Sequence, residues 1–208
     1  MPRAADPMAP TTLLMSLHRP SDAAIQAFLD LQRSQSFPYR GVGSSRHEPP
    51  TGYVVDHRRV CLDTGQRTFK AAYAALWRWQ MFQVGWAQLC WPTTGIEPGA
   101  VVGISASWGS LWFLNACRIV YVLDESTPVR RVGFAYGPLP GHAERGEERF
   151  SIEWHSNDTV WYDLLAFSRP GHWLIWLGYP CVRWLQRLFA LASLAAMVRA
   201  VGAPSACP

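Results

Sequence analysis

The sequence predicts an α+β fold of the helix-grip type, in which a seven-stranded antiparallel sheet is wrapped on a long C-terminal helix and carries an N-terminal helical appendage. Three observations predict it. A β-branched segment leads into an amphipathic helical pattern, and six further strand-like segments follow without another helix. The short turns between them favour antiparallel pairing, because parallel neighbours need long crossovers. A long apolar helical pattern closes the chain.

The N-terminal quarter of the chain is expected to lie outside the sheet. Residues 1–20 are rich in Pro and Ala, and we expect them to be disordered, as is the tail 202–208. Residues 21–52 hold a helix over 22–35, which Ser21 is placed to cap, and then a linker dense in Pro, Gly and Ser.

The helix-grip domain is expected over 53–201. Its first strand reads YVVDHRRVCL, and the helix after it carries apolar residues at spacings of three and four. The closing helix begins at Pro180, which suits a first turn, and Trp184, Leu188 and Leu191 are expected to face the sheet. The six later strands are expected near 83–91, 100–107, 115–124, 129–137, 147–155 and 159–167.

Composition excludes several functional classes. The net charge of +4 comes without any run of five basic residues, which argues against a nucleic-acid partner. Five scattered cysteines without a C-x-x-C pair indicate reduced core residues, and no metal site or cofactor is expected. The N-terminus lacks the uninterrupted apolar stretch of a signal peptide, so we predict a cytoplasmic protein.

Candidate site residues come from the strand faces and from the hairpin GFAYGPLPGHAERGEERFSIEW. This hairpin is either an ordinary charged turn or a segment that places polar side chains at the entrance of a cavity. Two embedded charges, Arg118 and Asp163, either form an internal ion pair or flank a ligand headgroup. The residues that we expect to contact a ligand are Tyr136, Glu148, Phe150, Trp154, Trp161, Asp163, Arg118 and His142.

Three segments carry a family resemblance: LNACRIVYVLDE, the GHAERGEERF hairpin and VWYDLLAFSRPGHWL. They resemble a bacterial and plant family known as a domain of unknown function, number nineteen-ninety, over roughly 37–201. The order of elements is also similar to the START and birch-pollen-allergen (SRPBCC) superfamily of helix-grip proteins, which implies a cavity for hydrophobic ligands. A plant relative described as a chloroplast envelope pore implies a pore-like alternative.

We therefore predict that the protein binds a hydrophobic small molecule between sheet and C-terminal helix, and we assign no catalytic residue. One alternative is a cyclase- or hydratase-like enzyme that uses Glu148, Asp163, His142 and Tyr136 as acids and bases. Another is an interaction module, in which the apolar side of the helix with Leu194 and Met197 binds a second subunit. This alternative allows a homo-oligomer.

The pore-like alternative requires an outward apolar band on the strands. Charged residues on the expected outer faces oppose it: Arg58, Arg130, Glu147, Arg149 and Glu153. The C-terminal helix is interrupted by Arg183 and Arg187, so no stable membrane insertion is expected either.

Overall fold

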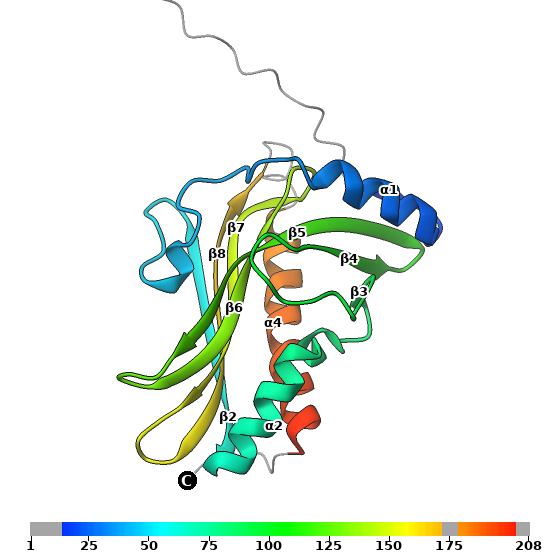
Figure 1. The fold of residues 1–208 in the computed structure, drawn as a ribbon. Helices are drawn as coiled ribbons and strands as arrows, with labels where there is room; N and C mark the ends of the chain where they lie inside the picture. The colour runs from blue at the N-terminus through cyan, green and yellow to red at the C-terminus, as the bar shows by residue number, and fades with distance from the viewer. Residues whose placement is uncertain (1–13, 172–178, 203–208) are drawn as a thin grey trace, which may run out of the picture.

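The computed structural model describes residues 14–171 and 179–202, and it confirms the helix-grip fold. Seven antiparallel strands form one curled sheet in the order β2-β8-β7-β6-β5-β4-β3, with a long C-terminal helix on its concave face (Figure 1). The strands are β2 (Val54–Thr64), β3 (Ala87–Leu89), β4 (Val101–Trp108), β5 (Leu111–Glu125), β6 (Arg130–Pro138), β7 (Glu144–Trp154) and β8 (Thr159–Pro170).

An additional short strand, β1 (Leu14–Ser16), lies within the segment that we expected to be disordered. It pairs with β5 at Trp112–Leu114, whereas β6 pairs with β5 only from Cys117 onward. β1 therefore satisfies backbone groups of β5 beyond the end of β6, which would otherwise form an exposed edge.

Two helices cover the concave face. They are α2 (Gly65–Trp77) and α4 (Tyr179–Val201), and a short 3-10 turn, η2 (Gln80–Phe82), follows α2. Trp79 takes a left-handed conformation between α2 and η2 and is 1% exposed. Because Met81 and Phe82 are drawn into the core there, the strand expected near 83–91 is reduced to the three residues of β3.

The predicted sheet-facing side of the last helix is wrong. Trp184, Leu188 and Leu191 are 51%, 37% and 53% exposed, whereas the buried residues are Ala190, Ser193, Ala196 and Met197. Small residues let the helix approach the sheet closely, and the Ser193 hydroxyl lies 2.9 Å from the Tyr162 hydroxyl. The prediction followed the largest apolar residues, but close packing selected a neighbouring helix face.

The outer face of the sheet is covered by the N-terminal segments. Helix α1 (Asp22–Gln32) begins as expected, since the Ala24 N–H donates to the Ser21 hydroxyl at 3.3 Å. It packs on β4 and β5 through a cluster that includes Ile25 and Leu29. Arg118 donates to the carbonyls of Gln32 and Arg33, at 3.0 and 2.9 Å, and so satisfies the free carbonyl end of the helix.

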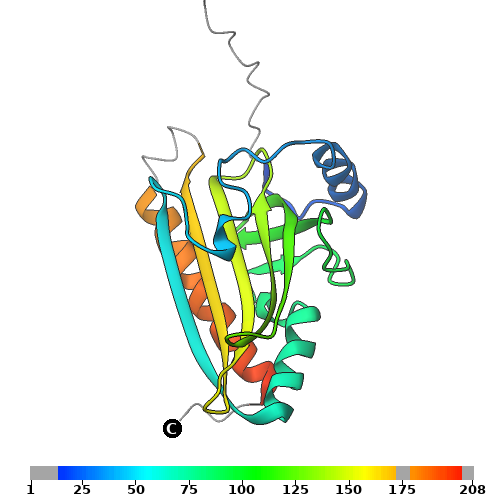
Figure 2. The same cartoon turned by 60° about the vertical axis from the view of Figure 1, so that its left-hand side comes forward.

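The predicted Pro- and Gly-rich linker is packed against the outer face of β7 and β8 (Figure 2). Its 3-10 turn, η1 (Ser44–Arg46), covers charged β7 residues of the outer face. Glu147 is 3% exposed and accepts hydrogen bonds from the Gly43 and Ser45 N–H groups and from the Tyr39 hydroxyl, at 2.7, 3.0 and 3.1 Å. Buried groups of this kind must be paired within the protein.

Charges on the outer face are paired with one another. Arg149 donates to Asp163 at 2.9 Å and to the Ser45 carbonyl at 2.8 Å, and His57 lies 2.5 Å from the other oxygen of Asp163. The expectation of an internal ion pair between Arg118 and Asp163 is therefore wrong, because Asp163 pairs with Arg149 instead.

Cysteine chemistry differs in part from the prediction. Cys90, Cys117 and Cys181 are free thiols, but Cys61 is disulfide-bonded.

In the described part of the chain, α4 is the one helix long and apolar enough to cross a membrane by length and composition alone. Of its apolar stretch, 22% is buried in the protein.

Candidate functional site

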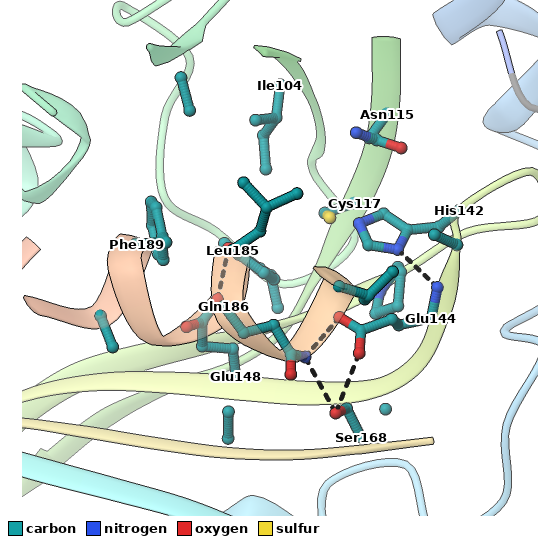
Figure 3. Close-up of a pocket in the computed structure, with 18 of the residues that line it drawn as sticks. Ile104, Asn115, Cys117, His142, Glu144, Glu148, Ser168, Leu185, Gln186 and Phe189 are labelled. Carbon is teal, nitrogen blue, oxygen red and sulfur yellow. Dashed lines mark hydrogen bonds between the residues drawn. The ribbon is translucent and has the colours of Figure 1, made fainter. Parts of the chain in front are cut away.

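A cavity of about 500 Å³ lies between the concave face of the sheet and α4 (Figure 3). Its walls are mostly apolar, which suits a hydrocarbon surface. Strands β4, β5 and β8 supply one side, and α4 with η2 supplies the other. The apolar lining residues are Phe82, Trp86, Ala87, Ile104, Ala106, Phe113, Leu164, Ala166, Val182, Leu185, Phe189 and Ala190.

Polar side chains gather in one part of this cavity. Glu144 and Glu148 share the inward face of β7, because residues separated by an even number point to the same side of a strand. Between them, Gly146 cannot carry a side chain, since a Cβ would lie 1.8 Å from the Phe167 carbonyl oxygen. Between the two carboxyl groups, Gly146 therefore contributes only its backbone to the lining of the cavity.

Glu144 is held in place by neutral donors. Gln186 of α4 donates to its Oε2 and also to the Ser168 hydroxyl at 3.0 Å, and Ser168 donates to its Oε1 at 3.4 Å (Figure 3). Burial raises the pKa of Glu144 to about 7, although nearby Arg183 acts in the opposite direction. Both carboxyl oxygens are thus already bonded to the protein.

Glu148 has a simpler environment. The Tyr136 hydroxyl on β6 donates to its Oε2 at 2.7 Å. Burial raises the pKa of Glu148 to about 7; the Tyr136 hydrogen bond opposes this shift, and the charge of Asp56 adds to it. Its Oε1 has no hydrogen-bond partner among the described residues, so this oxygen remains available to a ligand.

His142 enters the cavity from the loop before β7. Its Nδ1 accepts the backbone N–H of Glu144 at 3.1 Å, so a neutral ring carries its proton on Nε2. Burial lowers the pKa of His142 to about 4, which keeps the ring neutral near pH 7. The arrangement therefore offers a neutral donor and an open carboxyl acceptor in one apolar cavity.

Of the eight predicted site residues, three line the cavity: Tyr136, Glu148 and His142. Phe150 is fully buried in the core against Phe82, Phe134 and Tyr136. Trp154 stacks on Phe69 of α2 at 5.5 Å, away from the cavity.

The other three predicted residues lie on the outer face, and the expectation that they contact a ligand in the cavity is corrected. Arg118 binds the end of α1, and Asp163 binds Arg149. Trp161 lies under the Arg59 guanidinium at 4.1 Å from its ring centroid. On β8 the inward residues are the even-numbered ones, such as Tyr162 and Leu164, so choosing by aromatic character gave the wrong face.

Sequence reasoning missed several cavity residues. Glu144 was recognisable, because it shares the strand phase of Glu148. Asn115 lies within β5 and also lines the cavity. Gln186 and Ser168 carry no distinctive local pattern, and only the docking of α4 brings them to Glu144.

At the edge of the cavity, Asp56 of β2 accepts two hydrogen bonds from Arg183 of α4, at 2.5 and 2.8 Å. This pair fastens the start of the helix to the edge strand. No group of three His, Cys, Asp or Glu residues suited to a metal ion is present in residues 14–171 and 179–202. The geometry therefore describes an apolar cavity with a carboxyl-rich polar end.

Residues 38–196 match the family model "Domain of unknown function (DUF1990)". Similar proteins include a UPF0548 protein of Dictyostelium discoideum, 32% identical over 91% of this chain and 96% of its own length. A UPF0548 protein of Arabidopsis thaliana is 33% identical over 92% and 99%, and one of Deinococcus radiodurans is 34% identical over 89% and 98%.

Solved structures with a similar course of the chain include Ara h 8.0201, at 11% identity and a TM-score of 0.43. That match covers 70% of this chain and 99% of the other. A hypothetical protein from Helicobacter pylori gives 10% identity and a TM-score of 0.44, with coverage of 71% and 86%.

Proposed function

Because this chain belongs to the DUF1990 family, a domain family of unknown function, we propose its role from the geometry of its own cavity: it binds a hydrophobic small molecule that bears a polar head. The cavity carries this proposal. Its volume of about 500 Å³ lies in the range of small-molecule sites, and its walls are mostly apolar.

The test uses an apolar fluorescent ligand, N-phenylnaphthylamine, together with native mass spectrometry of freshly purified protein. In Ala166→Phe an aromatic ring fills the cavity from β8. We expect that variant to bind the ligand about tenfold or more weakly. Ala195→Phe adds the same ring on the exposed side of α4 and should bind like the wild type. Equal binding by both variants would contradict the proposal.

A second candidate is an enzyme that uses acids and bases in this cavity. The observation in its favour is that Tyr136, Glu148 and His142 all line the cavity, with the first two hydrogen-bonded at 2.7 Å. Asp163 leaves the set because it faces outward. A ligand eluted from Glu148→Gln protein that differs from the wild-type ligand by the mass of one water would support dehydration or hydration. Identical masses would oppose it.

The interaction surface predicted around Leu194 and Met197 of the C-terminal helix has little support. Met197 is fully buried and Leu194 packs against the core, so neither offers a free face to a second subunit. Cytoplasmic location without stable membrane insertion remains our prediction, since Arg183 and Arg187 interrupt the exposed half of α4. Recovery in a carbonate-washed membrane pellet would contradict it.

A further inference from the structure

The two acids that line the cavity differ from the buried acids on the outer face of the sheet. On the outer face, Asp163 pairs with Arg149 and Glu153 pairs with Arg131, at 2.9 and 3.1 Å. Within the described residues, Glu144 and Glu148 form no ion pair; their hydrogen-bond partners are neutral. A buried carboxylate without a cation is costly, and a ligand can supply the missing charge.

Glu148 is the more open of the two acids. Both oxygens of Glu144 are used by Gln186 and Ser168, whereas the described residues use only Oε2 of Glu148, through Tyr136. A ligand group can therefore reach Oε1 of Glu148 without displacing an existing bond.

The charges around Glu148 favour a cation. Asp56 of β2 and Glu144 of the same strand are acidic, and Tyr136 of β6 and Gln186 of α4 are neutral. Cys117 of β5 is a buried thiol whose pKa is raised by burial, so it is also neutral. Arg183 is held by Asp56 through two hydrogen bonds, and Arg58 is an exposed residue of the lining.

We infer that the cavity takes an apolar amine, whose ammonium group pairs with the carboxylate of Glu148 while its hydrocarbon part fills the apolar walls. This inference rests on the proposed function and adds the chemical class of the head group. An alcohol of the same length fills the same walls but brings no charge. A carboxylic acid of the same length would add a further negative charge beside three acids.

Binding of an amine must be coupled to the loss of a proton from the carboxyl group of Glu148. Without ligand, the pKa of Glu148 is about 7, so the carboxyl is mostly protonated below that pH and must lose its proton before it pairs with an ammonium. The affinity for an amine therefore falls as pH falls below about 7, by up to tenfold per pH unit for each proton released. Glu144, with a pKa of about 7, adds in the same direction, and His142, at about 4, stays neutral across this window.

The experiment compares decylamine, decan-1-ol and decanoic acid by titration calorimetry on the full chain. At about pH 8 we expect decylamine to bind the wild type about tenfold or more tightly than decan-1-ol. Glu148→Gln should equalise the two ligands while keeping its affinity for decan-1-ol. Glu97→Gln, an exposed acid outside the cavity lining, should behave like the wild type.

A measurement on the wild type alone guards against a variant that folds poorly. At about pH 6, in two buffers of different ionisation enthalpy, decylamine binding should release close to one proton and decan-1-ol binding should release none. Absence of proton release, or decanoic acid as the tightest ligand, would overturn the inference and leave the cavity proposal standing. If none of the three ligands nor N-phenylnaphthylamine binds, the proposed function itself fails.

Discussion

The two faces of strand β7 carry similar residues in different surroundings. On the outer face, the carboxylate of Glu147 accepts hydrogen bonds from Tyr39, Gly43 and Ser45, and Arg149 is held between Ser45 and Asp163. On the inner face, Glu148 has a single donor among the residues that the structure describes, Tyr136, and borders a cavity. The difference separates charges that hold the chain together from charges left available for a ligand.

Whether the protein's own groups satisfy the hydrogen-bonding capacity of a charged side chain is thus a better guide to its function than residue type. By residue type alone, ERGEER is a row of charges that looks solvated along its whole length. The outer charges instead fix the segment 37–52 onto the sheet, and the inner ones cost stability when they are ionised. Substitutions of these acids should therefore change the free energy of unfolding in opposite directions on the two faces.

The largest effect is expected at Glu147. Glu147→Ala leaves two backbone N–H groups and two hydroxyls without their acceptor in a buried site. We expect the free energy of unfolding to fall by about 3–5 kcal/mol in urea titrations. Glu125→Ala is the control, because that half-exposed acid makes long pairs with Arg46 and Arg131 and should cost less than about 1 kcal/mol. Equal losses of unfolding free energy in the two variants would show that the hydrogen bonds of Glu147 do not stabilise the fold.

The two sides of α4 give the next largest effect. Met197 is fully buried against the sheet, and Met197→Ala should lower the free energy of unfolding by about 2–5 kcal/mol. Leu188 is 37% exposed, so Leu188→Ala should cost less than about 1 kcal/mol. A larger loss at Leu188 than at Met197, in the same urea titrations, would mean that the helix presents its other face to the sheet.

A smaller effect of opposite sign is expected at Glu148. Its pKa is about 7 in the folded protein against 4.5 for the free side chain, so the protonated form is favoured by folding. That contribution is fully present below about pH 4.5 and is lost as pH rises through about 7. The ceiling for such a shift is about 3 kcal/mol, and the partial solvent exposure of Glu148 reduces it.

Glu148→Gln should therefore stabilise the unliganded protein by about 1–2 kcal/mol at about pH 8 and change little at about pH 4.5. Urea unfolding of both proteins at the two pH values measures this. Destabilisation at about pH 8 would show that Glu148 is a structural group like Glu147.

The smallest effect is expected from Tyr136→Phe. The Tyr136 hydrogen bond lowers the pKa of Glu148, so its removal should raise that pKa above about 7 by roughly one unit or less. Carboxyl carbon NMR titration of Glu148 reads the shift directly. Tyr73→Phe, on the exposed side of α2, should leave it unchanged. A fall in the pKa of Glu148 would contradict the hydrogen-bond assignment.

The fold was largely predictable because strand and helix periodicities are local. The meander over β4 to β8 and the amphipathic α2 follow from alternation, short turns and three-to-four spacing. The face of α4 was not predictable in this way, since both sides are apolar and Ala190 and Ser193 pack closer than Trp184 and Leu188 can.

The site was predictable only where strand phase fixed it. Tyr136 and Glu148 are opposite each other in the β6–β7 register, and alternation placed both inward. Contacts between distant segments decided the rest. Gln186 contacts Glu144, 42 residues away in the sequence, and Ser45 contacts Glu147, 102 residues away. The local sequence around Gln186 or Ser45 does not indicate either contact.

Methyl NMR of the protein titrated with decan-1-ol tests the central claim most directly, because adjacent leucines on β8 face opposite sides. Leu164 lines the cavity with Ile104 and Leu185, whereas Leu165 lies on the outer face opposite Arg149 in the sheet register. We predict saturable shifts for the methyl groups of Leu164, Ile104 and Leu185, and none for Leu165. Unchanged cavity methyl groups, or equal shifts on both faces, would contradict a ligand-binding cavity beneath α4.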